Sequence, residues 1–329
     1  MLKLSTPSRP RTIDELLDAQ LVARLSAVDI TSKKILAGKL KGERRSKRRG
    51  QSVEFADHRP YVVGDDLRHI DWNIMGRLEK LFLKMFLEEE DLALNIVLDA
   101  SGSHDAGEPS KFVFMQRLAI ALGYIGLTNM HRVTVSAIGG ELLTAAPVAS
   151  GGPAVAAGSE STDGPRVLSQ VRDLRGRRRL SDLGRWLCSL EPVGEAPFTE
   201  GCKRLALSRR GKGVTIVISD FLIKEGYETG LRLMLGRGYD VYAIQVLSPQ
   251  EIEPKLGGDL RLRDCEDGDM AEVTISAPLL KRYKATLTAY CNRLRDFCAA
   301  RGIMHMTVPS DTKVDALVLD VLRRKGLVK

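Results

Sequence analysis

Several short stretches of the chain are almost entirely apolar, and helix-like stretches lie between them. The clearest runs from Leu92 to Leu98 and ends in Asp99, which is typical of a strand that a parallel sheet buries on both faces. Similar patterns predict strands at Arg132–Ile138, Val214–Ile218, Asp240–Val246 and Ile303–Val308. Apolar residues at helical spacing predict helices at about 110–127, 182–190, 228–236, 279–300 and 312–324. The alternation favours an α/β fold with a doubly wound, mainly parallel sheet and helices on both faces.

The first 90 residues have a different pattern. Thr12 to Glu15 fits a capping box, in which Thr12 accepts from first-turn amides and Glu15 reaches back. Apolar residues then recur at helical spacing to Val28, so we predict one amphipathic helix over residues 13–29. Residues 52–63 and 81–86 favour β-structure. This part of the chain is therefore predicted to hold one helix and a small β-containing region.

Two segments interrupt the alternation. Residues 145–165 are rich in Ala, Gly and Ser with three prolines, which predicts a flexible loop. Residues 260–275 form two β-like runs around Asp267-Gly268, which predicts a hairpin. The predicted domains are a tail and helix at 1–34, a β-containing region at 35–89, the main α/β domain at 90–250, and a C-terminal hairpin, helices and last strand at 251–329.

Charge is concentrated in one stretch. The 329 residues carry a formal net charge of +8. Lys33–Arg49 alone holds nine basic residues and one acid, so its balance equals that of the whole chain. Such a run can neutralise phosphates, but it equally fits a solvated loop, and it has no aromatic residue on which bases could stack.

Cysteine usage and hydropathy narrow the class of protein. The five cysteines have no C-x-x-C spacing, so neither a zinc cage nor a redox dithiol is expected. No apolar run approaches the roughly 18 residues of a membrane span, and the first residues lack the apolar centre of a signal peptide. We therefore expect reduced thiols, no membrane span and a cytoplasmic protein.

In doubly wound sheets, ligands bind beyond the carboxyl ends of the strands. Polar side chains follow the predicted strands of this chain at these ends. Asp99, Ser101 and Ser103 follow the first core strand, Ser219-Asp220 ends a later one, and Ser181 begins a helix. Carboxylates and hydroxyls suit a hard cation such as Mg²⁺ and not zinc or copper, which favour imidazole and thiolate. A simpler alternative is that Asp99 and Ser101 only cap the next helix. His104 is expected to be exposed.

These motifs resemble the metal-ion-dependent adhesion site of von Willebrand factor A domains. That site combines Asp-x-Ser-x-Ser after a buried strand, a later Thr or Ser at a helix start, and a later Asp at another strand end. The resemblance implies a von Willebrand factor A-like fold for residues 90–250 and a bound Mg²⁺ or Mn²⁺, which need not be present before a partner binds. By this resemblance the ion's ligands are Asp99, Ser101, Ser103, Ser181 and Asp220.

A second resemblance is carried by residues 59–72, which match Arg-x-Tyr-x-x-Gly-Asp-Asp-x-Arg-x-Ile-Asp-Trp. This signature is similar to that of the domain of unknown function 58 family, and the similarity covers about 35–328. Ser219-Asp220-Phe221, Asp264-x-Glu266-x-Gly268 and Tyr283 also match, while Ser248-Pro249-Gln250-Glu251 stands where the family usually has Asp-Pro-x-Glu. The signature residues are Arg59, Tyr61, Gly64, Asp65, Asp66, Arg68, Asp71 and Trp72.

The resemblance implies a protein-interaction role. Members of the family are often paired with MoxR-type AAA+ ATPases that act in chaperone-like or metal-insertion work on client proteins. We therefore expect a non-enzymatic, metal-dependent interaction module whose protein partner, the ATPase or its client, supplies an Asp or Glu to the ion. The chain has no G-x-x-x-x-G-K-[ST] run and is not expected to be the ATPase itself. Nucleic acid is not an expected partner.

The signature region admits two interpretations. In the structural one, its acids pair with arginines and Trp72 anchors a β layer on the core. In the alternative, Asp65, Asp66 and Asp71, with His58 and His69, form the site of a phosphate-ester hydrolase or nuclease that Lys33–Arg49 helps to guide. A third hypothesis, a plain nucleic-acid binder, rests on Lys33–Arg49 alone.

Overall fold

The computed structural model describes residues 9–30, 55–63, 65, 67–86, 92–142, 167–208 and 213–329. They belong to two compact units, one made of residues 1–37 with 92–329 and the other of residues 38–91. The predicted loop at 145–165 and the basic run Lys33–Arg49 lie outside the described residues.

The larger unit is built on a six-stranded sheet with the strand order β12-β9-β8-β3-β4-β6. Five neighbouring strands are parallel, and only β6 at the edge is antiparallel. The prediction of a mixed α/β fold with a mostly parallel sheet is confirmed. The strands are β3 (Ala93–Asp99), β4 (Arg132–Ile138), β6 (Ser169–Leu174), β8 (Gly213–Ser219), β9 (Asp240–Leu247) and β12 (Met304–Pro309).

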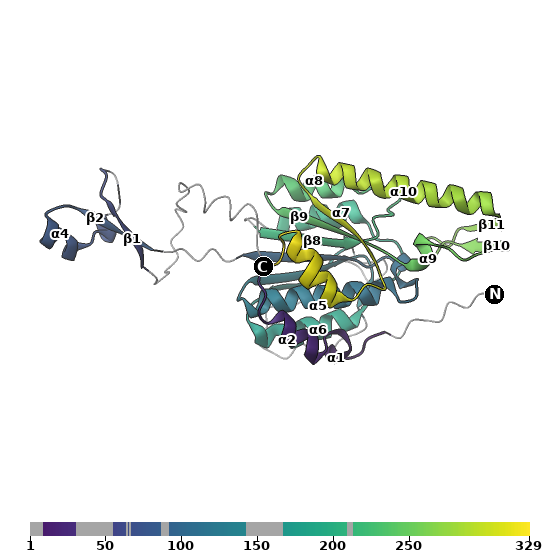
Figure 1. Ribbon diagram of the computed structural model, residues 1–329, viewed down its shortest axis with the longest axis horizontal. Helices are drawn as coiled ribbons and strands as arrows, with labels where there is room; N and C mark the ends of the chain where they lie inside the picture. The colour runs from purple at the N-terminus through teal and green to yellow at the C-terminus, as the bar shows by residue number, and fades with distance from the viewer. Residues whose placement is uncertain are drawn as a thin grey trace. The chain divides into compact units, whose positions relative to one another are not determined.

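Helices cover both faces of this sheet (Figure 1). Along β3, Leu94, Ile96 and Leu98 point into the core beneath α5, whereas Val97 packs into a second core on the other face. Successive side chains of a strand point to opposite faces of the sheet, and both faces are buried here, so β3 is apolar at nearly every position. The helices are α5 (Lys111–Thr128), α6 (Leu180–Ser189), α7 (Phe198–Ser208), α8 (Glu228–Gly236), α9 (Pro249–Ile252), α10 (Ala277–Ala299) and α11 (Val314–Ala316), which a π-helical turn (Leu317–Leu322) follows.

The predicted single helix over residues 13–29 is wrong in its continuity. The chain forms α1 (Ile13–Leu16) and α2 (Ala19–Leu25), because Asp18 accepts a hydrogen bond from the amide of Leu21 and begins a new helix. The Thr12 hydroxyl donates to the Glu15 carboxylate instead of accepting from an amide. Both helices pack beside α5 on the same face as α6 (Figure 1).

Some elements of the larger unit were not predicted. Strand β6 holds only two apolar residues, Val171 and Leu174, lies at the sheet edge and pairs antiparallel with β4. Helix α7 buries Phe198 and Cys202 against α8. A short pair also forms between β5 (Glu141–Leu142) and β7 (Leu190–Glu191).

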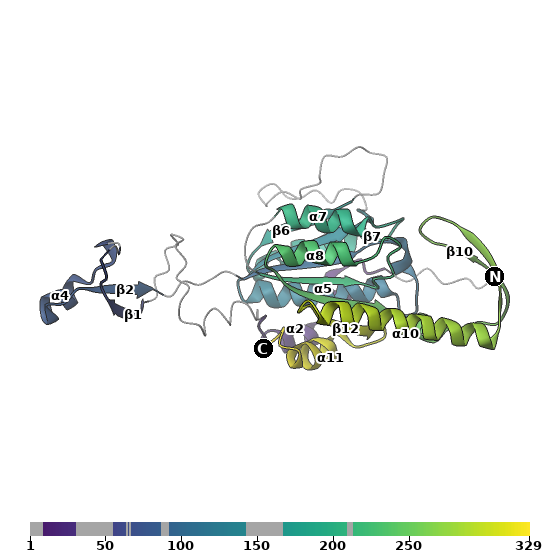
Figure 2. The same ribbon diagram turned by 90° about the horizontal axis from the view of Figure 1, so that it is seen from above.

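The C-terminal part is not a separate layer, because β12 extends the sheet beside β9. The predicted hairpin is present as β10 (Gly258–Arg263) and β11 (Met270–Ile275), joined by the turn 264–269. Figure 2 shows it standing out from the sheet beside the first residues of α10. The hairpin is therefore attached to the larger unit but largely exposed.

The smaller unit is a two-stranded antiparallel pair with short helices. It contains β1 (Phe55–Pro60), β2 (Phe82–Phe86), a 3₁₀ turn (Leu67–His69) and α4 (Trp72–Leu78). Ile70 and Leu83 are buried, while Trp72 is 63% exposed. That Trp72 anchors a β layer on the core stays a prediction, because it concerns a contact between the two units.

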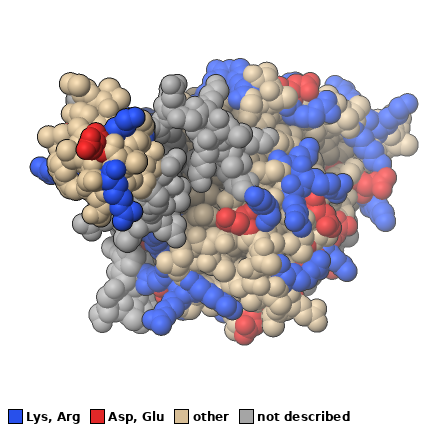
Figure 3. All heavy atoms as spheres, turned by 60° about the vertical axis from the view of Figure 1, so that its left-hand side comes forward, with Lys and Arg blue, Asp and Glu red and all other residues tan. Residues whose placement is uncertain are grey.

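No helix among the described residues is both long and apolar enough to cross a membrane. On the face drawn in Figure 3, lysines and arginines are scattered with acidic side chains between some of them. The described surface on that face thus shows no continuous basic track.

Candidate metal centre

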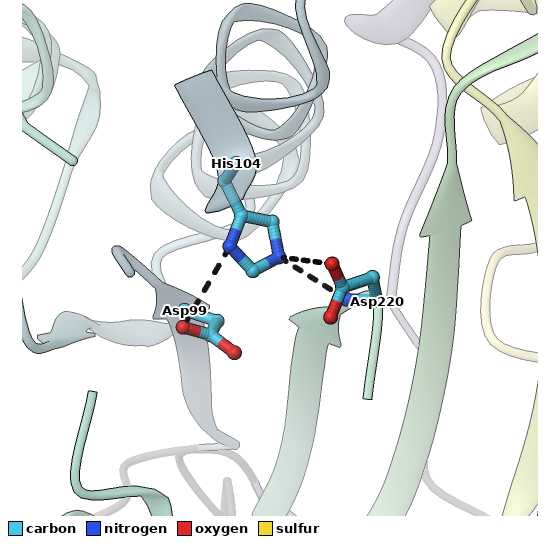
Figure 4. A group of neighbouring side chains, drawn as sticks. All are labelled: Asp99, His104 and Asp220. Atoms are coloured by element: carbon cyan, nitrogen blue, oxygen red, sulfur yellow. Dashed lines mark hydrogen bonds and ion pairs between the residues drawn. The ribbon is translucent and has the colours of Figure 1, made fainter. Parts of the chain in front are cut away.

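The candidate site lies at the carboxyl edge of the sheet, where β3 and β8 end side by side. The two strands are parallel neighbours, with Leu98 opposite Ile218. Their directions therefore bring Asp99 and Asp220 to the same edge, as the sequence predicts. Figure 4 shows the two carboxylates on either side of the His104 ring.

Both oxygens of Asp99 are held by neutral donors. The Ser101 amide donates to Oδ1 over 3.1 Å, and the Ser219 hydroxyl donates to Oδ2 over 2.7 Å. The residue is only 3% exposed. Among the described residues no Lys or Arg pairs with it, and the nearest ionisable nitrogen is His104 Nδ1 at 3.8 Å. Asp99 is thus a buried carboxylate without a fixed cation.

The two serines of the first motif, which is Asp99-x-Ser101-x-Ser103, lie together. Ser101 Oγ is 3.0 Å from Ser103 Oγ and 2.9 Å from Nδ1 of His104. The 3₁₀ turn Gly102–Asp105 brings these side chains to one side of the loop. The hydroxyls that the sequence assigned to one site are therefore neighbours.

His104 is fully buried, so the expectation of an exposed side chain is wrong. Its Nε2 lies 3.2 Å from the amide of Asp220, which donates to it. Because an amide can only donate, Nε2 holds a lone pair in this arrangement and the ring proton is on Nδ1, from which it is donated to Ser101. The ring therefore joins the loop after β3 to the loop after β8.

A buried lysine also belongs to the site. Lys111, the first residue of α5, is 0% exposed, and its Nζ lies 2.8 Å from Asp220 Oδ2 and 2.6 Å from Glu251 Oε1. Burial by itself would lower the pKa of Lys111, but the two carboxylates outweigh it and raise that pKa. Burial would raise the pKa of Asp220, but the neighbouring His104 and Lys111 lower it on balance.

The charges in this group do not cancel. Asp99, Asp220 and Glu251 bring three carboxylates, and Lys111 brings one ammonium group. Buried charge is costly unless it is paired or bound to a metal. Asp99, His104 and Asp220 each offer a ligand atom, and these atoms lie within 4.8 Å of one another. The arrangement therefore fits a cation bound beside Asp99.

The structure does not bring Ser181 to this edge. Since β6 runs antiparallel to β4 and ends with Leu174 opposite Val133, the chain enters α6 at the opposite edge of the sheet. Ser181 is exposed there, and its hydroxyl donates to the carbonyl of Arg178 over 3.4 Å. The assignment of Ser181 to the site, which rested on the resemblance and on its place at a helix start, is therefore wrong, because the strand before this helix is antiparallel.

A different segment, and not the one that contains Ser181, contacts the first motif. Gly102 donates to the carbonyl of Gly194 over 2.8 Å, and Val193 donates to the carbonyl of Ala100 over 3.2 Å. These residues follow β7 and precede α7. The third loop at this edge is thus residues 192–197, which the sequence did not indicate.

Described signature residues engage basic groups or the backbone. Arg59 pairs with Asp65, and Asp71 lies 2.9 Å from Nε2 of His58 and 3.5 Å from Nζ of Lys84. Asp71 also caps α4 by accepting from two amides. The bond to His58 contributes most to a lowered pKa of Asp71, and the capping amides and Lys84 add to it against the effect of burial.

The pair of Arg59 with Asp65 has the form that the structural interpretation predicts, whereas Asp71 pairs with a histidine and a lysine and not with an arginine. The amide of Tyr61 donates to the carbonyl of Leu81, the residue before β2, which joins the signature to that strand. Arg68 lies on the 3₁₀ turn of this unit. Gly64 and Asp66 lie outside the described residues.

The fold and the site define an α/β protein with a candidate metal centre at the carboxyl edge of its sheet. The chain belongs to the family described as "Protein of unknown function DUF58", which matches residues 57–290. It is 26% identical to the uncharacterized proteins Rv1480 of Mycobacterium tuberculosis and Mb1516 of Mycobacterium bovis over 94% of this chain and 92% of theirs.

Two solved structures are similar at a low level. The conserved hypothetical protein BatB from Bacteroides thetaiotaomicron has a TM-score of 0.39 and 13% identity, over 71% of this chain and 98% of that one. The pilus adhesin SpaC from Lactobacillus rhamnosus GG has a TM-score of 0.41 and 10% identity, over 74% and 31%. Neither similarity is close enough to assign a fold.

Proposed function

We propose that this protein is a non-enzymatic, divalent-metal-dependent protein-interaction module with a von Willebrand factor A-like core. The observation that carries the proposal is the buried Asp99 carboxylate, which lies beside Asp220 with no Lys or Arg partner among the described residues. A cation at this point would offset the remaining negative charge.

The donor atoms favour Mg²⁺ or Mn²⁺. Both nitrogens of His104 are engaged, one by the Asp220 amide and one by Ser101. The donors left for an ion are oxygens, namely the carboxylates of Asp99 and Asp220 and the hydroxyls of Ser101 and Ser103. When bound, the ion supplies positive charge to which a carboxylate from another protein can be attached.

Hydrogen bonding at Ser101 favours binding over catalysis. Ser101 and His104 are in contact as a nucleophile and its base would be. However, the amide of Asp220 holds the lone pair of Nε2, so the ring donates its Nδ1 proton to Ser101 and does not accept one. Ser101 is also only 4% exposed. This arrangement does not activate the hydroxyl.

Calorimetric titration with Mg²⁺ and with Mn²⁺ tests the metal centre. We expect one equivalent to bind to the wild type and none to Asp99→Asn, which keeps the size of the side chain. Asp105→Asn is the matched control, because Asp105 lies in the same loop but pairs with Arg9. Equal heats for wild type and Asp99→Asn would contradict the proposal.

The proposed partner is an AAA+ ATPase of the MoxR type or its client, which the family resemblance supports. Capture from cells that express the protein naturally, with and without a chelator, tests this part. We expect the wild type to recover such a protein only when divalent metal is present, and Asp99→Asn not to recover it. Recovery that is unaffected by both the chelator and the substitution would contradict the metal-dependent partner.

A further inference from the structure

We propose that the acidic turn between β10 and β11, residues 264–269, acts as the chain's own ligand for the carboxyl edge of the sheet. A partner would then bind by presenting an acidic segment that replaces this turn. The inference rests on the proposed function, because it takes the same edge to be the binding surface.

Contact between the turn and the first motif is direct. A Cβ placed on Gly102 would lie 3.1 Å from the carbonyl oxygen of Cys265 and 3.3 Å from the amide nitrogen of Gly194. Gly102 lies between Ser101 and Ser103, so the turn touches the motif that carries the candidate ligands. Three loops therefore meet at a position where a side chain has little room.

A lysine from the loop that contains Asp220 forms ion pairs with the turn. Lys224 follows Asp220 by four residues, and its Nζ lies 3.0 Å from Asp264 and also pairs with Asp267. The bond from Lys224 contributes most to a lowered pKa of Asp267, and the Glu266 amide contributes most for Asp264. The turn is thus attached to both loops of the candidate metal centre.

The chemistry of the turn is that of the proposed ligand. Its six residues include four acids, Asp264, Glu266, Asp267 and Asp269. Two of them pair with Lys224, whereas Glu266 is half-buried and has no ion pair among the residues that the structure describes. An acidic segment of this kind supplies the carboxylates that a metal-bearing edge would attract.

The attachment is weak enough to be exchanged. The hairpin has only two strands, and most of its side chains are exposed, so it has little stability of its own. The ion pairs of Lys224 are also solvent-exposed, and such pairs contribute little to stability. A partner segment that binds the same edge can therefore displace the turn.

Hydrogen–deuterium exchange on the full chain tests whether the turn covers the edge, and it requires no metal. In Lys224→Ala we expect faster exchange both in residues 264–269 and in residues 100–105. Lys203→Ala is the control, because Lys203 forms a similar exposed pair with Glu200 on α7. If only the turn exchanged faster in Lys224→Ala, it would not cover the first motif and the inference would be wrong.

A trans-binding experiment separates this inference from the metal proposal. In the variant, Asn-Gly replaces residues 264–269, and the probe is a labelled peptide with the sequence of residues 263–270. We expect the peptide to bind the variant at least tenfold more tightly than the wild type, in which the tethered turn competes. Binding that persists in chelator would support the turn as ligand while contradicting the metal function. No binding to the variant with or without Mn²⁺ would overturn the inference.

Discussion

Nζ of Lys111 lies 2.8 Å from Oδ2 of Asp220, in the interior of the protein, where the lysine has no exposed surface. The same nitrogen contacts Glu251, which the capping box of α9 holds in place. The ammonium group of Lys111 is therefore held beside Asp220. It compensates part of the negative charge at this edge and leaves Asp99 without a cation among the described side chains.

We expect Lys111→Met to destabilise the larger unit by about 3–5 kcal/mol, because it leaves the buried Asp220 and the half-buried Glu251 without their partner. Urea unfolding followed by circular dichroism measures the loss. Lys203→Met is the control, and as an exposed change it should cost less than about 0.5 kcal/mol. Similar losses in the two variants would show that the buried contact carries no special stability.

Ser101→Ala and Ser181→Ala test which serine belongs to the metal centre. At Mn²⁺ concentrations near 100 times its Kd, binding should stabilise the wild type by about 2.7 kcal/mol. We expect Ser181→Ala to keep this stabilisation, since Ser181 lies at the opposite edge of the sheet, and Ser101→Ala to lose part of it. Thermal unfolding with and without Mn²⁺ measures both. A larger loss in Ser181→Ala would contradict the site described here.

How much of this site the sequence predicts depends on strand direction. The apolar runs of β3 and β8 identify buried parallel strands, so Asp99 and Asp220 could be placed at one edge. Strand β6 has a mixed pattern because it lies at the sheet edge, so both the strand and its antiparallel direction were missed. That single reversal moves Ser181 to the wrong side.

Long-range contacts account for the rest of what was missed. Lys111 lies 109 positions from Asp220 and 140 from Glu251 along the chain, and no local pattern pairs them. A lysine at the start of a mostly apolar helix was the available signal, together with Glu251 in the Ser-Pro-Gln-Glu segment that stands where the family usually has Asp-Pro-x-Glu. The burial of His104 likewise follows from its bonds to two loops.

Asp71 should make the smaller unit sensitive to acid. Its folded pKa is lowered, chiefly by the bond to His58, so it stabilises the folded unit above its unfolded pKa. This stabilisation is lost as the pH falls through the folded value. We expect Asp71→Asn to unfold the unit more readily near neutral pH and to flatten its response to acid.

Tryptophan indole NMR signals can follow this effect in one unit at a time, because Trp72 lies in the smaller unit and Trp186 in the larger. In Asp71→Asn the Trp72 signal should show unfolding at a lower temperature, while that of Trp186 stays at its wild-type transition. An unchanged Trp72 transition would show that the contacts of Asp71 do not stabilise this unit.

His305 should make the larger unit less stable at mildly acidic pH. Burial lowers the pKa of this β12 histidine to about 4, and Arg295 and Lys325 act in the same direction. Its Nε2 is buried without a hydrogen-bond partner among the described residues. Between pH 6.5 and about 4 the unfolded chain takes up a proton that the folded one does not, so stability falls as the pH falls.

The expected contribution of His305 is about 1–2 kcal/mol after allowance for solvent screening of this partly exposed ring. Free energies of unfolding in urea between pH 6.5 and 4 measure it. His305→Met should have a shallower pH dependence than the wild type. Equal slopes would assign the acid sensitivity to other groups.

Gly102→Ala should displace the acidic turn without unfolding the protein. The new methyl group would lie 3.1 Å from the Cys265 carbonyl oxygen and 3.3 Å from the Gly194 nitrogen, so one of these neighbours has to move. The hairpin turn moves more easily, because the ion pairs of Lys224 that hold it are solvent-exposed, whereas Gly194 is hydrogen-bonded to Gly102 itself. We expect faster hydrogen exchange in residues 264–269.

Gly236→Ala is the control, since a Cβ there meets nothing within 4 Å, and it should leave exchange in the turn unchanged. Unaltered exchange in Gly102→Ala would mean that the contact with Cys265 does not position the turn.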